Sequence, residues 1–167
     1  MAGLLGGCFQ PLYASRSITG GSAVVDQLRS VDVAPIKTTI GNLDGGLAVE
    51  LRNALIFELT GGAAANSPTH RLNVHFQALR QQVIVDITTS RPDVEQAGVN
   101  ASFSLIEIAS GRVVVTGQTF ARVSYDSPGQ EQRFARARGR KDAETRAMKV
   151  IAEDVRSRLA SYFIAGT

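Results

Sequence analysis

An alternation of apolar and polar side chains constrains the fold of this chain more than any other feature of its sequence. Every second residue is apolar between residues 71 and 78, and the same period returns between residues 99 and 106. A period of two places successive side chains on opposite faces of a strand, so each stretch predicts a half-buried strand. The apolar positions are Leu72, Val74, Phe76, Ala78, Val99, Ala101, Phe103 and Leu105.

Turn signals connect these strands to further strand segments. The apolar run Val83–Ile87 predicts a continuation or a bulged extension of the first strand, and Arg91-Pro92 predicts an interruption. Ser110-Gly111 predicts the turn of a hairpin whose second strand covers residues 112–123. Gly117 lies inside that strand and predicts a bulge.

Two other segments repeat with the period of a helix. Leucines recur every four residues from Leu47 to Leu59, after the predicted N-cap Asp44 and before the expected stop at Gly61-Gly62. Residues 134–162 carry apolar side chains at steps of mostly three or four, beginning with Phe134, which predicts one long helix. Gly139 lies within it and predicts a kink or a later start.

These elements define a fold class. A first strand is predicted at Val31–Lys37, so the order is strand, helix, three strands and helix. We predict an α+β two-layer sandwich, with both helices on one face of a four-stranded, mostly antiparallel or mixed sheet. Residues 30–167 form this single domain, and residues 9–29 form a linker. The predicted core contains Leu51, Leu55, Val74, Phe76, Phe103, Leu105, Val115, Ala147, Ile151, Val155 and Leu159.

Composition excludes several classes of protein. The chain has 167 residues, of which 44% are hydrophobic and 20% charged, as expected for a globular domain. No apolar run is long enough for a transmembrane helix, and a single cysteine cannot form an internal disulfide. The net charge of +3 is uneven, because residues 122–167 hold 10 basic and 6 acidic side chains.

The single cysteine lies in a lipidation motif. Leu5-Gly6-Gly7-Cys8 has the leucine and small residues that precede the acylated cysteine of a bacterial lipoprotein. Residues 1–8 are therefore interpreted as a truncated signal and anchor segment, because a complete signal has a basic start and a longer apolar region. Stable anchoring requires more than one acyl chain on Cys8. Phe9 rather than aspartate follows Cys8, so the common signal for inner-membrane retention is absent.

Short motifs along nearly the whole chain resemble the short, divergent branch of the LptE family of lipopolysaccharide-assembly lipoproteins. They are Cys8–Tyr13, Leu51–Leu55, Leu105–Gly111 with Gly117, Tyr125, Asp142-Ala143, Arg146-Ala147, Leu159 and Tyr162-Phe163. The resemblance implies a lipid-anchored protein on the periplasmic side of the Gram-negative outer membrane. It also implies a plug that helps to assemble the LptD β-barrel and takes part in lipopolysaccharide transport. A lipid-anchored accessory subunit of a lipid-transporting ABC system is the alternative.

One cluster of charge is conspicuous near the start of the predicted long helix. Arg133, Arg136, Arg138, Arg140 and Lys141 fall within nine residues, where the helix dipole disfavours cations. Helical spacing brings Arg133, Arg136 and Arg140 together and directs Arg138 elsewhere. A solvated helix face is one interpretation. A site for lipopolysaccharide phosphates, core-sugar carboxylates or an acidic barrel lumen is the functional one, because guanidinium groups bind such anions bidentately.

The sequence contains few signals of catalysis or metal binding. His70 and His75 have no neighbouring cysteine, and the interpretation that they are ordinary solvent-facing histidines is favoured over a metal site. No serine has the surroundings of a nucleophile elbow. The basic cluster lacks the stacking aromatics of a nucleic-acid site. We therefore predict no enzymatic activity, no catalytic residue, no metal, no cofactor and no nucleic-acid partner.

Overall fold

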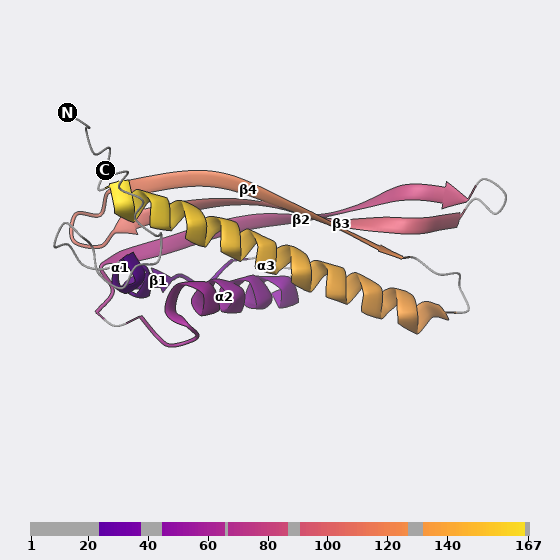
Figure 1. Cartoon of the computed structure of the whole chain (residues 1–167), viewed down its shortest axis with the longest axis horizontal. Helices are drawn as coiled ribbons and strands as arrows, with labels where there is room; N and C mark the ends of the chain where they lie inside the picture. Colours follow the sequence, from indigo (N-terminus) through magenta and orange to yellow (C-terminus); the bar gives the residue numbers. More distant parts are fainter. Residues whose placement is uncertain (1–23, 38–44, 66, 87–90, 127–131, 166–167) are drawn as a thin grey trace, which may run out of the picture.

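The computed structural model describes residues 24–37, 45–65, 67–86, 91–126 and 132–165. Its helices and strands are, in chain order, α1 (Val24–Arg29), β1 (Val31–Val33), α2 (Gly45–Thr60), β2 (His70–Asp86), β3 (Arg91–Glu107), β4 (Val113–Asp126) and α3 (Arg133–Ala165). A four-stranded sheet has the order β1-β2-β3-β4, with β1 parallel to β2 and the other pairs antiparallel. Figure 1 shows α2 and α3 on one side of this elongated sheet, which confirms the predicted α+β two-layer fold.

The helix α2 is the crossover that parallel pairing of β1 and β2 requires. Its inward stripe is Leu47, Ala48, Leu51, Leu55 and Leu59, all buried. Gly61 ends the helix with a φ of 72°, a left-handed conformation that glycine adopts without strain. The amide of Gly61 donates to the carbonyl of Phe57, which confirms the stop predicted at this position.

The strands β2, β3 and β4 form two long hairpin pairings. The predicted break between the two strands is present, because β2 ends at Asp86 and β3 begins at Arg91, but Arg91 and Pro92 themselves belong to β3 and pair with the end of β2. The extension of the first strand through Val83 is confirmed, with register shifts on either side of Ile84. Pro92 is the second residue of β3. Proline is tolerated near the start of a strand, where the missing backbone N–H costs little.

The bulge predicted at Gly117 is wrong. Leu105 pairs with Val115 and Ile106 with Val113, so the irregularity lies at Val114. Gly117 instead pairs with Phe103, and a Cβ at position 117 would lie 2.5 Å from the ring Cζ of Phe103. The ring therefore fills the space that a side chain on β4 would need, which explains a glycine inside this strand.

The core lies between the sheet and the two long helices. Of the predicted core residues, Phe76 and Val115 are half-buried, and the others are buried. The structure adds Met148, Ala152 and Ala160 from α3, as well as Leu28 from α1. Leu28 shows that the linker prediction is wrong for residues 24–29, which form a helix packed on the core. Residues 9–23 lie outside the described residues.

The start of α3 differs from the prediction. The helix is continuous through Gly139, so neither a kink nor a late start is present. Phe134 is 89% exposed, and Ala137 is exposed as well. The apolar stripe therefore becomes buried only from Ala143, because the first turns of α3 diverge from the sheet (Figure 1). Asp44 lies outside the described residues.

Candidate functional site

A cleft of about 690 Å³ lies between the first turns of α3 and the segments of β2 and β3 around Arg80 and Glu95. The residues that line this arginine cleft are Arg80, Gln81, Gln82, Glu95, Arg133, Arg136, Ala137 and Arg140. Four of them carry guanidinium groups, contributed by β2 and α3. The cleft forms where α3 leaves the sheet. At this level of β2 the inward-facing apolar residues, which end with Ala78, are followed by the polar segment Arg80–Gln82.

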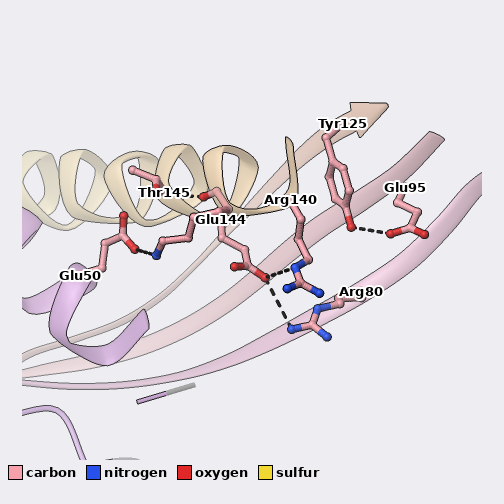
Figure 2. Close-up of polar contacts among 8 residues, drawn as sticks. Glu50, Arg80, Glu95, Tyr125, Arg140, Glu144 and Thr145 are labelled. Atoms are coloured by element: carbon pink, nitrogen blue, oxygen red, sulfur yellow. Dashed lines mark hydrogen bonds and ion pairs between the residues drawn. The ribbon is translucent and has the colours of Figure 1, made fainter. Parts of the chain in front are cut away.

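One carboxylate holds two of these arginines together. Glu144 Oε1 lies 3.6 Å from Arg80 Nη2 and 3.9 Å from Arg140 Nε. Figure 2 shows both guanidinium groups directed at this single carboxylate, one from β2 and one from α3. The carboxylate of Glu144 is largely buried, whereas both guanidinium groups stay about half-exposed. The two ion pairs bring two cations from different layers of the fold side by side.

A second carboxylate organises the opposite side of the cleft. Tyr125 Oη on β4 donates a hydrogen bond of 2.5 Å to Glu95 Oε2 on β3. Arg136 on α3 forms an ion pair with Oε1 of the same carboxylate. Glu95 therefore links three elements, and its side chain is largely buried, whereas that of Arg136 stays half-exposed.

The balance of charge makes this cleft attractive to anions. Arg80, Arg133, Arg136 and Arg140 face the two carboxylates Glu95 and Glu144, so cations exceed anions by two. Guanidinium groups that stay half-exposed can still bind a phosphate or carboxylate through paired N–H donors. The positive end of the α3 dipole lies at the same end of the helix and adds to the attraction.

The structure separates the five cations that the sequence groups together. Arg133, Arg136 and Arg140 line the arginine cleft, whereas Arg138 and Lys141 do not. Lys141 Nζ lies 2.5 Å from Glu50 Oε2 and so ties α3 to α2. Burial opposes ionisation of Glu50, but hydrogen bonds with Lys141 and Thr145 outweigh it and keep the pKa of Glu50 below its ordinary value. Arg133 and Arg138 form no ion pair with any residue that the structure describes.

Sequence reasoning missed the contributions of Arg80, Glu95 and Tyr125. A signal was nevertheless present in the strand alternation. Arg80 continues the inward-facing positions of β2, and Glu95 precedes those of β3 with the same period of two. A charged residue at a position that should face the core indicates that the core ends there. Two such residues on paired strands mark the place where the cleft replaces the core.

The buried phenol of Tyr125 gives the cleft a measurable response to pH. Burial, together with the hydrogen bond to Glu95 and its negative charge, raises the pKa of Tyr125 from 10.0 to about 12. Between these values the folded state keeps a proton that the unfolded state releases, so the free energy of unfolding falls as the pH rises. We expect denaturation between about pH 9 and about pH 11.5 to show a smaller loss of stability in Tyr125→Phe than in the parent. Equal losses in both proteins would contradict this account of Tyr125.

Two features are absent from the part of the chain that the structure describes. The described residues contain no group of three or more histidine, cysteine, aspartate or glutamate side chains arranged to hold a metal ion. None of the helices in the described ranges combines the length and apolar character needed to cross a membrane.

Several lipoproteins of solved structure share this architecture. A lipoprotein from Caulobacter crescentus has a TM-score of 0.67 at 17% identity, with 86% of this chain and 97% of that chain covered. Rare lipoprotein B from Shewanella oneidensis has a TM-score of 0.57 at 11% identity, with 81% and 96% covered. A minor lipoprotein from Acinetobacter baumannii has a TM-score of 0.58 at 11% identity, with 80% and 92% covered. At these identities the likeness establishes a shared fold.

The family follows from the sequence itself. No protein among the curated sequences matches the chain. The model of the LptE family, described as lipopolysaccharide-assembly, matches residues 28–159. This span begins in α1 and reaches the last turns of α3, so it includes the whole sheet and the arginine cleft. The chain belongs to the LptE lipopolysaccharide-assembly family.

Proposed function

We propose that this protein is an outer-membrane lipoprotein that plugs an LptD-type β-barrel, assists its assembly and takes part in delivering lipopolysaccharide. The family match over residues 28–159 carries the proposal. The role is one of assembly and transport rather than catalysis. Large β-barrels enclose a lumen that other protein segments can fill. An elongated two-layer domain has a suitable shape for such a lumen (Figure 1).

The arginine cleft is our candidate for the lipopolysaccharide contact. Lipopolysaccharide carries phosphates on lipid A and carboxylates in its core sugars, and these are the anions that paired guanidinium groups favour. Glu95 and Glu144 position Arg136, Arg80 and Arg140 but leave the cleft with an excess of positive charge. Arg133 has no ion-pair partner among the described residues and is therefore available to an anion.

A single charge reversal tests this contact. We expect Arg133→Glu to weaken binding of purified lipopolysaccharide by about tenfold, because a charged hydrogen bond is lost and a repulsion is added. The affinity of the parent should also fall as salt rises above about 0.1 M, because exposed charges are screened. Binding is measured with the full chain and lipopolysaccharide micelles, and circular dichroism verifies the fold.

Arg138→Glu is the matched control for this test. Arg138 lies on the same helix and also has no ion-pair partner among the described residues, but it lies outside the cleft. Its reversal changes the net charge equally and should leave the affinity almost unchanged. Equal losses in both variants would indicate a general charge effect, and no loss in either would exclude the cleft. Reversal of Arg136 and Arg140 is less informative because each would bring a carboxylate beside Glu95 or Glu144.

Cys8 is our proposed site of lipid attachment, and it lies outside the described residues. The motif Leu5-Gly6-Gly7-Cys8 is the basis for this assignment. We expect intact-mass analysis of the protein extracted from membranes to show a chain that begins at Cys8 and carries acyl groups. Cys8→Ser should lack these groups and leave the membrane fraction. A mature parent chain that begins upstream of Cys8 and keeps a free thiol would contradict the assignment.

A further inference from the structure

The face of the sheet opposite α2 and α3 contains a second hollow, unrelated to the arginine cleft. This sheet hollow has a volume of about 540 Å³ and lies across the middle of β2, β3 and β4. The strand register arranges its outward side chains in two rows. The rows are Gln77, Asn100 and Phe120, followed by His75, Ser102 and Gln118. All six side chains are exposed.

The polar groups of the sheet hollow are free to bind a ligand. None of the amide, hydroxyl and imidazole side chains in the two rows forms a hydrogen bond with another described residue. Phe120 is 64% exposed, and the guanidinium carbon of Arg122 lies 5.4 Å from its ring centroid. This contact orients the ring while much of its surface stays open to solvent. The hollow therefore combines several unused donors and acceptors with one fixed aromatic surface.

We propose that the sheet hollow binds a neutral stretch of a saccharide chain. Amides and hydroxyls can donate to and accept from sugar hydroxyl groups, and the ring of Phe120 offers an apolar surface to the C–H face of a sugar. Neighbouring strands lie about 4.8 Å apart and alternate residues about 6.7 Å apart, so the two rows span an area of the size of a few sugar rings. The volume also falls within the range of ligand clefts.

The chemistry of the two rows favours this ligand over other classes. A protein interface has a core of aromatic and aliphatic side chains, whereas the two outward rows of the hollow contain one phenylalanine, Phe120, and otherwise only amide, hydroxyl and imidazole side chains. A nucleic acid requires several cations along its backbone, and neither row contains one. Phosphorylated sugars would prefer the arginine cleft, whose Arg80 faces the opposite side of the sheet.

A titration followed by NMR tests the location of this site. The full chain, labelled with ¹⁵N, is titrated separately with a neutral linear hexose oligosaccharide and a neutral N-acetylhexosamine oligosaccharide. We expect at least one of them to cause saturable shifts in the amides of β2, β3 and β4 around His75, Ser102 and Phe120. The affinity should not change with salt, because the hollow contains no ionic contact to screen. Absence of shifts with both probes, or shifts confined to the arginine cleft, would overturn the proposal.

Two phenylalanine variants test the chemistry of binding. We expect Phe120→Ala to weaken the saccharide by about threefold to tenfold. Phe57→Ala removes an equally exposed ring, 64% accessible, from α2 and should have no effect. An equal loss in both variants, or no loss in Phe120→Ala, would overturn the proposal. The saccharide site does not depend on the barrel complex. A negative result in this titration therefore does not contradict the barrel complex, and absence of the complex does not contradict the saccharide site.

Discussion

Truncation of Ile151 to alanine is expected to lower the free energy of unfolding by about 2–5 kcal/mol. Ile151 is completely buried on α3, in the layer where this helix meets α2 and the sheet. Removal of its side chain takes away apolar contacts and leaves a cavity that the surrounding elements can fill only in part. Urea denaturation of both proteins, monitored by circular dichroism, measures the difference.

Val150 provides the control for this truncation. It precedes Ile151 on the same helix but is 45% exposed. Val150→Ala should change the stability by only about 0.5 kcal/mol, since surface substitutions usually have small effects and alanine favours a helix. Equal losses for the two variants would mean that the face of α3 assigned to the core is incorrect.

Gly117 and Phe103 are expected to behave as one unit in a double-mutant cycle. Gly117→Ala should destabilise the protein by about 1–3 kcal/mol, because its Cβ would overlap the ring of Phe103. Phe103→Ala alone should cost about 3–5 kcal/mol through lost burial. In the double variant the new methyl group enters space that the ring has vacated, so the second substitution should cost little. The three variants should therefore be strongly non-additive.

A second glycine in the sheet shows whether this effect is specific. Gly98 lies on β3, and a Cβ there would meet Leu79 at 3.6 Å, an ordinary contact distance. Gly98→Ala should therefore be tolerated or slightly stabilising, because alanine is less flexible than glycine in the unfolded chain. Additive losses for Gly117→Ala and Phe103→Ala would contradict the close approach of ring and glycine. A large loss in Gly98→Ala would point to a general effect of glycine replacement in this sheet.

The sequence predicted the fold where a single period dominates. The alternation around Phe103 and the four-residue repeat around Leu51 identified the buried faces of strand and helix, because one buried face imposes its period directly. The helix α1 was missed because six residues are too few to establish a period. The bulge was misplaced because Gly117 is explained by a ring on another strand, and a sequence alone does not reveal that contact.

The candidate site could be predicted only in part. The cations of α3 are adjacent in sequence, so their concentration near Arg136 was evident. Their ion pairs join distant parts of the chain, as Lys141 on α3 and Glu50 on α2 illustrate. These pairs depend on how α3 packs against α2 and the sheet. Arg80 belongs to the site only because its strand passes beside the start of α3. Charge density is therefore readable from sequence, whereas the division between structural and available cations requires the fold.

Co-purification from outer membranes tests the central claim most directly. The full-length precursor, tagged at its C-terminus and expressed in a Gram-negative host that has its own lipopolysaccharide, is extracted in mild detergent. Proteins captured with it are then identified by mass spectrometry and their stoichiometry is measured. We predict an equimolar complex with an LptD-type β-barrel that withstands high salt. Recovery of an inner-membrane ABC transporter without the barrel, or of the lipoprotein alone from intact outer membranes, would contradict the account.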